Sequence, residues 1–303
     1  MTRVLACGGL TIDWLQTESG RSGPSLGGNA AYAAVGAWLA GADAEVVAVI
    51  GDDYPAELLK AFSTAGIGTS SVRTSPGPSF RVLLDESRAR RTISYLPDSG
   101  HNDRLDPLPS QLPELQRTDA VHVCPIPTAS QCALIDAVAG RVGIVSLDTV
   151  IIPGEIEPTA SGLLDLARRA DVFMPSRDEV DQHWPGSVED ALHELVDAGC
   201  ARVVVKLGPD GSIGRDGADE IRIPAAQARV VDPIGAGDSY CGAVCARLGA
   251  GDSLATAMRW GAAAASVIIE GHGAAHALTG AGRARVIDRV AELEQRVATG
   301  TRA

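Results

Sequence analysis

The chain is predicted to fold as an α/β protein with a doubly wound, mainly parallel sheet, helices on both faces and a small β-sheet lid. Three observations predict this fold. Short apolar runs alternate with helical patterns along most of the 303 residues. One pair of segments alternates apolar and polar side chains with a period of two, which is typical of an exposed hairpin. Helical patterns dominate after Gly237. Because no linker or internal repeat is visible, we expect a single domain over residues 1–303.

The main sheet is expected to contain six short apolar runs: Val4–Cys7, Glu45–Ile50, Ala120–Cys124, Val142–Leu147, Asp171–Met174 and Arg202–Leu207. Helices are expected between them at Asn29–Ala40, Ala56–Ala65, Ala129–Ala139, Ser161–Arg169 and Val188–Ala198. Strands and helices in alternation produce parallel strands whose carboxyl ends meet at one edge. Ligands bind at that edge in such folds, so the residues that directly follow the strands are candidates for a site.

Residues 79–96 interrupt this alternation. Phe80–Leu84 and Arg91–Tyr95 have a period of two, and the charged turn Asp85–Arg90 separates them. A segment at about residues 10–18 is expected to add a strand beside this hairpin. We expect the two segments to form a small sheet that closes over the strand ends as a lid. The alternative is a surface hairpin without a role.

Composition restricts the partners that the chain can bind. A net charge of −12 and a pI of about 4.9 argue against nucleic acid and against an anionic membrane surface. The longest apolar run, Gly261 to Ile269, is too short to span a membrane, and the first residues lack the core of a signal peptide. Six scattered cysteines form neither a C-x-x-C pair nor a zinc-like spacing. We therefore expect a cytoplasmic protein with reduced thiols that binds small molecules.

The most informative stretch is Val231–Tyr240, which follows an extended run and precedes a helical pattern. The small residues Gly235, Ala236 and Gly237 let backbone N–H groups converge at the helix N-terminus, and such a cluster attracts an anion. A carboxylate at Asp238 is unfavourable beside an anion, unless it takes a proton from a nucleophile that attacks that anion. The alternative is an aspartate that only caps the helix.

Two motifs in the first part of the chain suit the binding of hydroxyl groups. Asp13 ends the first strand region, and its carboxylate can accept hydrogen bonds from two sugar hydroxyls. Gly27, Gly28 and Asn29 open a helix with two small residues and with an amide that can both donate and accept. Taken singly, the first motif is equally consistent with an ordinary turn and the second with a helix start.

Two further motifs follow strands in the second half. Lys206–Gly211 is expected to form a tight turn at the edge where ligands bind. Glu179 can hold a hydrated Mg²⁺ through water, although with Ser176 it also matches a capping box. The sequence contains no G-x-x-x-x-G-K-[ST], G-x-S-x-G or H-E-x-x-H motif. Its six histidines are dispersed, and we assign none of them to catalysis.

In their order and spacing these motifs resemble those of the ribokinase-like (PfkB-type) sugar and nucleoside kinases, over nearly the whole chain. The matching elements are Asp13, Gly27-Gly28-Asn29, the hairpin at 79–96, the turn Gly208–Gly211, the G-A-G-D signature Gly235–Asp238 and the late pair Gly273-Ala274. Two positions depart from the family pattern. Pro233 stands where the family usually has Thr, and Ser176 replaces the Asn of its Asn-x-x-Glu motif.

The resemblance implies an ATP-dependent phosphotransferase with a ribokinase-like fold. Asp238 would take the proton from the acceptor hydroxyl as catalytic base, and the transferred phosphoryl group would be stabilised by the backbone N–H groups of Gly235, Ala236 and Gly237. The acceptor would be held by Asp13, Gly27, Gly28 and Asn29. ATP would be bordered by Lys206, Gly208, Gly211, Ala262 and Gly273. Glu179 would help to hold Mg²⁺ through water.

Some members of this family also bind K⁺ beside the anion site. By resemblance, the K⁺ ligands in this chain would be Asp232, Ile234, Ile268, Gly271 and Gly273. A serine that often completes the site is Ala277 here.

The acceptor itself stays open. The hydroxyl-binding residues favour a sugar, whereas aromatic side chains such as Trp14 and Tyr95 could stack a nucleobase, so a nucleoside kinase is the alternative. A sugar- or nucleotide-binding regulatory protein without turnover is a third hypothesis, and only Pro233 and Ser176 support it. The apolar residues of the lid need a partner, and a homodimer formed through the lid would supply one.

Overall fold

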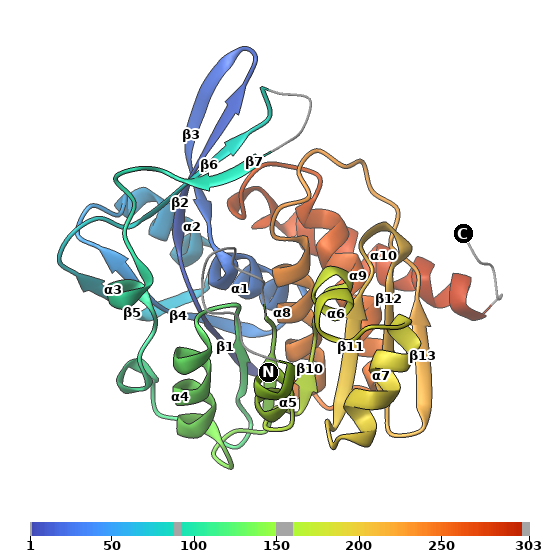
Figure 1. Cartoon of the computed structure of the whole chain (residues 1–303). Helices are drawn as coiled ribbons and strands as arrows, with labels where there is room; N and C mark the ends of the chain where they lie inside the picture. The colour runs from blue at the N-terminus through green and yellow to red at the C-terminus, as the bar shows by residue number, and fades with distance from the viewer. Residues whose placement is uncertain (1, 88–91, 150–159, 299–303) are drawn as a thin grey trace.

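The computed structural model describes residues 2–87, 92–149 and 160–298 of the chain. Within these residues the strands form two separate sheets, and helices lie against the faces of the larger one (Figure 1). The predicted charged turn at 85–90 lies partly outside the described residues. No helix of the described part is both long and apolar enough to cross a membrane.

The larger sheet has nine strands in the order β13-β12-β11-β10-β9-β8-β1-β4-β5. Its strands are β1 Arg3–Cys7, β4 Asp43–Gly51, β5 Gly68–Ser75, β8 Ala120–Val123, β9 Ile144–Leu147, β10 Val172–Phe173, β11 Arg202–Lys206, β12 Ser212–Asp216 and β13 Asp219–Ile223. From β11 to β5 all pairs are parallel, while β12 and β13 add an antiparallel edge. The carboxyl ends of the parallel strands therefore share one edge.

Helices cover both faces of this sheet, as the doubly wound prediction requires (Figure 1). One face carries α1 Asn29–Leu39, α8 Ala236–Gly249, α9 Leu254–Ile268 and α10 Gly280–Ala298, together with α2 Ala56–Ala65. The other face carries α4 Thr128–Val138, α5 Ala160–Ala167, α6 Arg177–His183 and α7 Val188–Asp197. Adjacent residues of β1 show the division, because Val4 packs in the first core and Leu5 in the second. The remaining short elements are α3 Asn102–Leu105 and the 3₁₀ turns Pro109–Gln111, Gly208–Asp210 and Ala275–Ala277.

Helices α1 and α8 pack backbone against backbone. A β-carbon on Gly36 of α1 would collide with the carbonyl oxygen of Ser239, and one on Gly242 of α8 would collide with the carbonyl of Ala33. Glycine at these two positions therefore allows the close approach. The contact holds the N-terminus of α8, where the predicted anion site begins, against the helix that follows the first hairpin.

The small sheet has the strand order β3-β2-β6-β7 and projects from one end of the body (Figure 1). Its strands are β2 Thr11–Thr17, β3 Gly20–Gly27, β6 Phe80–Asp85 and β7 Thr92–Tyr95. Strands thus occur in both segments that were predicted to form the lid. The sequence analysis missed β3, whose glycines, serines and proline carry no apolar alternation, although it pairs antiparallel with β2.

β5 and β12 were not predicted, and the extended run that was predicted before Val231–Tyr240 contains a strand only at Asp219–Ile223. β5 lies at the edge of the large sheet, and Ser71 is its single buried residue, so it shows no apolar run. The strand β13 ends at Ile223, directly before Pro224, which cannot donate a backbone hydrogen bond to a ladder. β5 and β13 are the two outer strands of the large sheet, whereas β12 lies between β11 and β13.

Candidate active site

A cavity of about 510 Å³ lies at the carboxyl edge of the large sheet. It is lined by residues that follow β8, β9, β10 and β11 and by the first turn of α8: Pro125, Asp148, Thr149, Ser176, Arg177, Asp178, Glu179, Lys206, Leu207, Gly208, Pro209, Gly237 and Asp238. Segments far apart in the sequence therefore converge on one space. The edge is the one at which parallel α/β sheets bind their ligands.

One wall of the cavity is the first turn of α8. Gly235 caps this helix with a φ of 75°, a left-handed conformation that favours glycine, and the ring of Tyr32 lies where a side chain would project. Gly237 faces the cavity. The N–H of Ala236 contacts the carbonyl oxygen of Pro233 at 3.3 Å. The first N–H groups of a helix lack partners within the helix, so this turn can stabilise an anion.

Asp238 lies in the same wall, one residue beyond the glycine turn. It is not the capping residue, because Gly235 occupies the cap position. Burial raises the pKa of the Asp238 carboxyl; the Lys206 ammonium opposes this shift, while the charge of Glu179 adds to it. A carboxylate with a raised pKa is a stronger proton acceptor than one at the surface.

Lys206 and Asp148 form a buried ion pair in the cavity wall. The Lys206 Nζ lies 2.5 Å from Asp148 Oδ2, and the two side chains are only 13% and 3% exposed. Burial disfavours the charge of Lys206, but Asp148 and Glu179 outweigh it and raise the pKa of the ammonium. Lys206 therefore carries a fixed positive charge close to Gly237: a β-carbon added to this glycine would lie 3.6 Å from Nζ.

Glu179 combines a capping role with a place in the cavity. The backbone N–H of Ser176 donates to Glu179 Oε2 at 2.6 Å, which matches the predicted capping box at the start of α6. Burial raises the pKa of the Glu179 carboxyl, and the charge of Asp148 raises it further. Among the residues that the structure describes, no group of three or more His, Cys, Asp or Glu side chains is arranged to hold a metal by itself.

The residues predicted to border ATP divide into two groups. Lys206 and Gly208 line the cavity, and the space beside the Cα of Gly208 is open. Gly211, with a φ of 91°, instead packs against the end of β13 and shapes the turn. Ala262 in α9 and Gly273 after it are buried, and neither belongs to the described lining of this cavity.

The predicted acceptor residues lie where the small sheet joins the body. Asp13 is 3% exposed and accepts a hydrogen bond from Thr11 Oγ1. Gly27 lies directly against this carboxylate, and a β-carbon there would collide with it. Burial raises the pKa of Asp13 to about 7; the Thr11 hydroxyl opposes the shift, and the charge of Asp232 adds to it.

Asn29 connects the loops that follow β1 and β8. Its amide oxygen accepts from the N–H of Gly9 at 2.8 Å, and its amide nitrogen donates to the carbonyl of Pro125 at 2.5 Å. Gly28, with a φ of 98°, packs so tightly that a β-carbon would lie 2.8 Å from the Cα of Leu10. Since Pro125 lines the cavity, Asn29 connects the cavity to the residues that were predicted to hold the acceptor.

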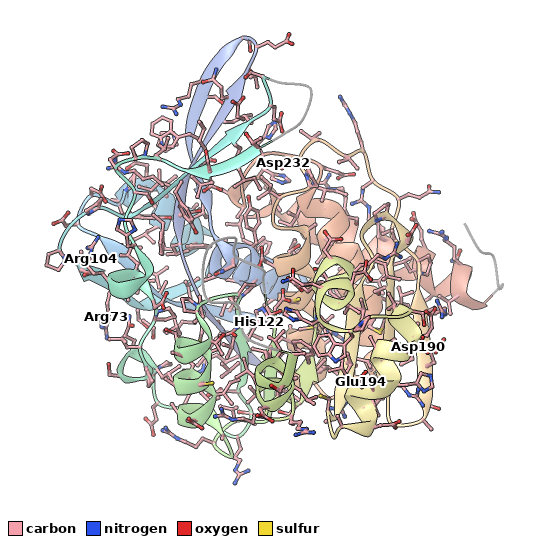
Figure 2. The ribbon with its side chains drawn as sticks, in the orientation of Figure 1. Arg73, Arg104, His122, Asp190, Glu194 and Asp232 are labelled. Carbon is pink, nitrogen blue, oxygen red and sulfur yellow. The ribbon has the colours of Figure 1, made fainter. Side chains whose placement is uncertain are left out.

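The residues predicted as K⁺ ligands lie in two segments that meet near the small sheet, where Figure 2 labels Asp232. Asp232 is 1% exposed, and its Oδ1 accepts from the N–H of Ile234 at 2.9 Å. The N–H groups of Val231 and Asp232 donate to the carbonyl of Ile269 at 2.7 and 3.1 Å. Two histidines also contact this loop: His272 is next to Asp232, and His276 is next to Ile268.

Asp148 is the main site residue that the sequence analysis missed. It directly follows the run Val142–Leu147, so its position after a predicted strand was the available signal. Arg177 was not among the predicted site residues, and it lines the cavity and pairs with Asp210 at 3.1 Å. No motif marked either residue.

Comparisons with known proteins agree with this geometry. Residues 2–280 match the model of the family described as pfkB family carbohydrate kinase. The chain is 27% identical over 266 residues to a cytidine kinase of Thermococcus kodakarensis, covering 86% of this chain and 94% of that protein. It is 26% identical over 271 residues to a 5-dehydro-2-deoxygluconokinase of Listeria innocua, covering 84% and 83%. The structure of aminoimidazole riboside kinase from Salmonella enterica, complexed with aminoimidazole riboside and an ATP analog, superposes with a TM-score of 0.76 at 20% identity, covering 95% and 100%.

The superposition shows that the chain has the ribokinase-like fold. The chain belongs to the pfkB family of carbohydrate kinases. It is accordingly an ATP-dependent phosphotransferase that uses an alcohol group as acceptor.

Proposed function

We propose that the enzyme phosphorylates a hydroxyl of a small sugar or sugar-like acceptor, with Asp238 as general base. The supporting observation is that Asp238 and Gly237 line one cavity with Lys206 and Glu179. The acceptor hydroxyl gives its proton to Asp238 while its oxygen bonds to the γ-phosphorus of ATP, and the bond to the leaving ADP oxygen breaks. The N–H groups at Gly235–Gly237 form the anion hole for the transferred group.

The nucleotide is proposed to lie along the ends of β10 and β11. Lys206 supplies a fixed charge for the phosphates, and the open space beside Gly208 admits the ligand. Gly211 shapes this border through its turn. Ala262 and Gly273 are assigned to the adenine side.

Mg²⁺ fits the donor groups that the cavity offers. A hard cation prefers oxygen ligands and usually keeps several waters with one or two carboxylates and the substrate phosphates. Glu179 and Asp148 are two carboxylates that line the same cavity, so they would hold hydrated Mg²⁺. The bound ion would neutralise charge on the polyphosphate.

The acceptor is proposed to bind between the small sheet and the body, held by Asp13, Gly27, Gly28 and Asn29. A buried carboxylate beside small residues suits two neighbouring hydroxyls, which is why a sugar is favoured. A nucleoside is the alternative acceptor, and the similarity to a cytidine kinase supports it. In either case we propose that residues 10–18 and 79–96 form a lid that excludes water.

Two further proposals concern the state of the protein. Ile93 and Tyr95 of the small sheet are 62% and 61% exposed, so we propose that a second copy covers this face in a homodimer. All six cysteines are free, and five of them are buried, which supports the cytoplasm as the compartment.

An ADP-release screen across sugars and nucleosides with the wild-type enzyme and Asp238→Asn tests the proposal. We expect turnover on at least one sugar, and we expect the variant to bind ATP normally while kcat falls by about 10²–10⁴, the usual contribution of a positioned base. A folded Asp238→Asn variant with near-wild-type kcat would refute the assignment of the base. Binding of sugar and ATP without ADP release would instead favour a regulatory protein.

A further inference from the structure

The loop after α9 holds together the two halves of the proposed site. The carbonyl of Ile269 accepts from the N–H groups of Val231 and Asp232, which lead into the glycine turn of α8. Five residues further on, the N–H of Ala274 donates to the carbonyl of Leu26 at 2.9 Å, beside the acceptor residue Gly27. Whatever stabilises this loop therefore positions both the anion hole and the acceptor strand.

K⁺ would stabilise this loop by binding its carbonyl groups, but a histidine already contacts one of these carbonyls. His276 Nε2 lies 2.8 Å from the carbonyl oxygen of Ile268. Since a carbonyl oxygen only accepts, Nε2 must carry the hydrogen. The same ring lies over Gly271, where a β-carbon would be 2.7 Å from the ring atoms Cγ and Nδ1. One imidazole thus contacts two of the residues that were predicted to bind K⁺.

The carboxylate of Asp232 has donors on both of its oxygens. Oδ1 accepts from the N–H of Ile234 at 2.9 Å, and Oδ2 lies 3.2 Å from Nδ1 of His272. The position at which a serine often completes the site is Ala277, which is buried and offers no side-chain oxygen. The groups present therefore fit K⁺ poorly: the Ile268 carbonyl and the Asp232 carboxylate already accept from N–H donors, and the hydroxyl that often completes the site is missing.

We propose that His276, assisted by His272, replaces the monovalent cation of this site, so that the enzyme works without K⁺. His276 is a positioning residue, because it acts through the loop and contacts no reacting atom. Its role requires an N–H donor directed at Ile268 rather than a particular charge. The turnover part of the test rests on the proposed phosphotransfer. Binding of K⁺ is measured separately, through the thermal midpoint of the ligand-free protein.

The test compares K⁺ with Na⁺ at equal ionic strength, using turnover and the thermal midpoint of the ligand-free protein. The wild-type enzyme should show the same kcat and the same midpoint in both salts. His276→Ala should leave the loop carbonyls free, lower kcat in Na⁺ by about tenfold or more, and recover activity and thermal stability in K⁺, because an ion that binds only the folded state stabilises it. His276→Gln keeps an N–H donor and should stay independent of K⁺.

His193→Ala is the matched control, because His193 is exposed on α7 and contacts Arg215. It should behave as wild type in both salts. A wild-type enzyme that is activated severalfold or stabilised by K⁺ over Na⁺ would overturn the proposal, whether or not any variant folds. So would a folded His276→Ala that retains full activity in Na⁺. If no acceptor is turned over, the proposed function fails, while the thermal midpoints still decide the question of the cation.

Discussion

Lys206 is one of two lysines in the chain, the other being Lys60, and it lies in an acidic cavity. Its positive charge lowers the pKa values of the Asp148, Glu179 and Asp238 carboxyls and so opposes the effect of burial on each of them. Removing one partner of a buried pair leaves the other charge uncompensated, and this usually costs more than the pair itself contributes. The pair is therefore expected to matter for stability as well as for phosphate binding.

We expect Lys206→Met to lower the free energy of unfolding by about 3–5 kcal/mol, because Asp148 would remain buried without its cation. The double variant Lys206→Met, Asp148→Asn should recover part of this loss. Chemical denaturation measures both. Lys60→Met on exposed α2 serves as the control and should stay within about 0.5 kcal/mol of wild type. If Lys206→Met alone were as stable as wild type, the charges of Lys206 and Asp148 would have to be screened by solvent.

Asp13 should make stability depend on pH. Its pKa is about 7 in the folded protein, against 3.8 for the ordinary group, so the folded state keeps this proton longer than the unfolded state does. The stabilisation is fully present below about pH 4 and is lost as the pH rises to about 7. Asp13→Asn removes this dependence, so relative to wild type it should gain up to about 4 kcal/mol between pH 4 and pH 8.

Denaturation at pH 5, 6.5 and 8 measures this effect. The exposed Asp43→Asn variant is the control, and its difference from wild type should not change over the same range. Parallel pH curves for wild type and Asp13→Asn would mean that Asp13 titrates as an ordinary surface carboxyl.

At the scale of elements, the close contact between α1 and α8 positions the glycine turn at the start of α8. Gly36→Ala should force the helices apart, since its β-carbon would meet the backbone of Ser239. We expect a loss of about 1–3 kcal/mol in the free energy of unfolding, which is typical of overpacking, together with a lower kcat. Gly280→Ala has open space at the start of α10 and should be neutral or stabilising by up to about 1 kcal/mol. Equal effects of the two substitutions would contradict the role of this contact.

The small sheet should respond to the acceptor if it acts as a lid. Its strand β7 forms one edge of the four-stranded sheet and presents the exposed apolar side chains of Ile93 and Tyr95. We expect hydrogen exchange across residues 79–96 to slow when acceptor is added, while β13 at the far edge of the large sheet stays unchanged. Unchanged exchange in both regions, at saturating acceptor, would show that the small sheet does not close.

At the scale of the whole molecule, the exposed face of the small sheet predicts association. Ile93 and Ile287 have similar exposures of 62% and 57%, but only Ile93 lies on the small sheet, next to Tyr95. We expect sedimentation to show a dimer that Ile93→Lys converts to a monomer and that Ile287→Lys leaves intact. A wild-type protein that stays monomeric at all concentrations would exclude the dimer. The apolar face of the small sheet would then have to be buried against the body of the protein when the lid closes.

The architecture was readable because the central strands are buried on both faces. Such strands appear as continuous apolar runs, and all six predicted runs are strands of the large sheet. β3 and β5 escaped detection because edge strands need few buried side chains. β12 escaped detection because Ile213 is its single large apolar residue, so it shows no apolar run. The glycine turn before Asp238 was readable for another reason: a residue with a positive φ at a helix start leaves a local signature.

From the sequence alone we could predict the alternation of strands and helices, the positions of the glycine turns and the family to which the motifs point. Only the tertiary structure decided which charges meet. Lys206 and Asp148 are separated by 58 positions, and nothing local announces their pairing. The same holds for the raised pKa of Asp13 and for the imidazole of His276 beside the Ile268 carbonyl. Desolvation and Coulomb interactions depend on distance in space, and distance in space between remote segments is set by the packing of the whole chain.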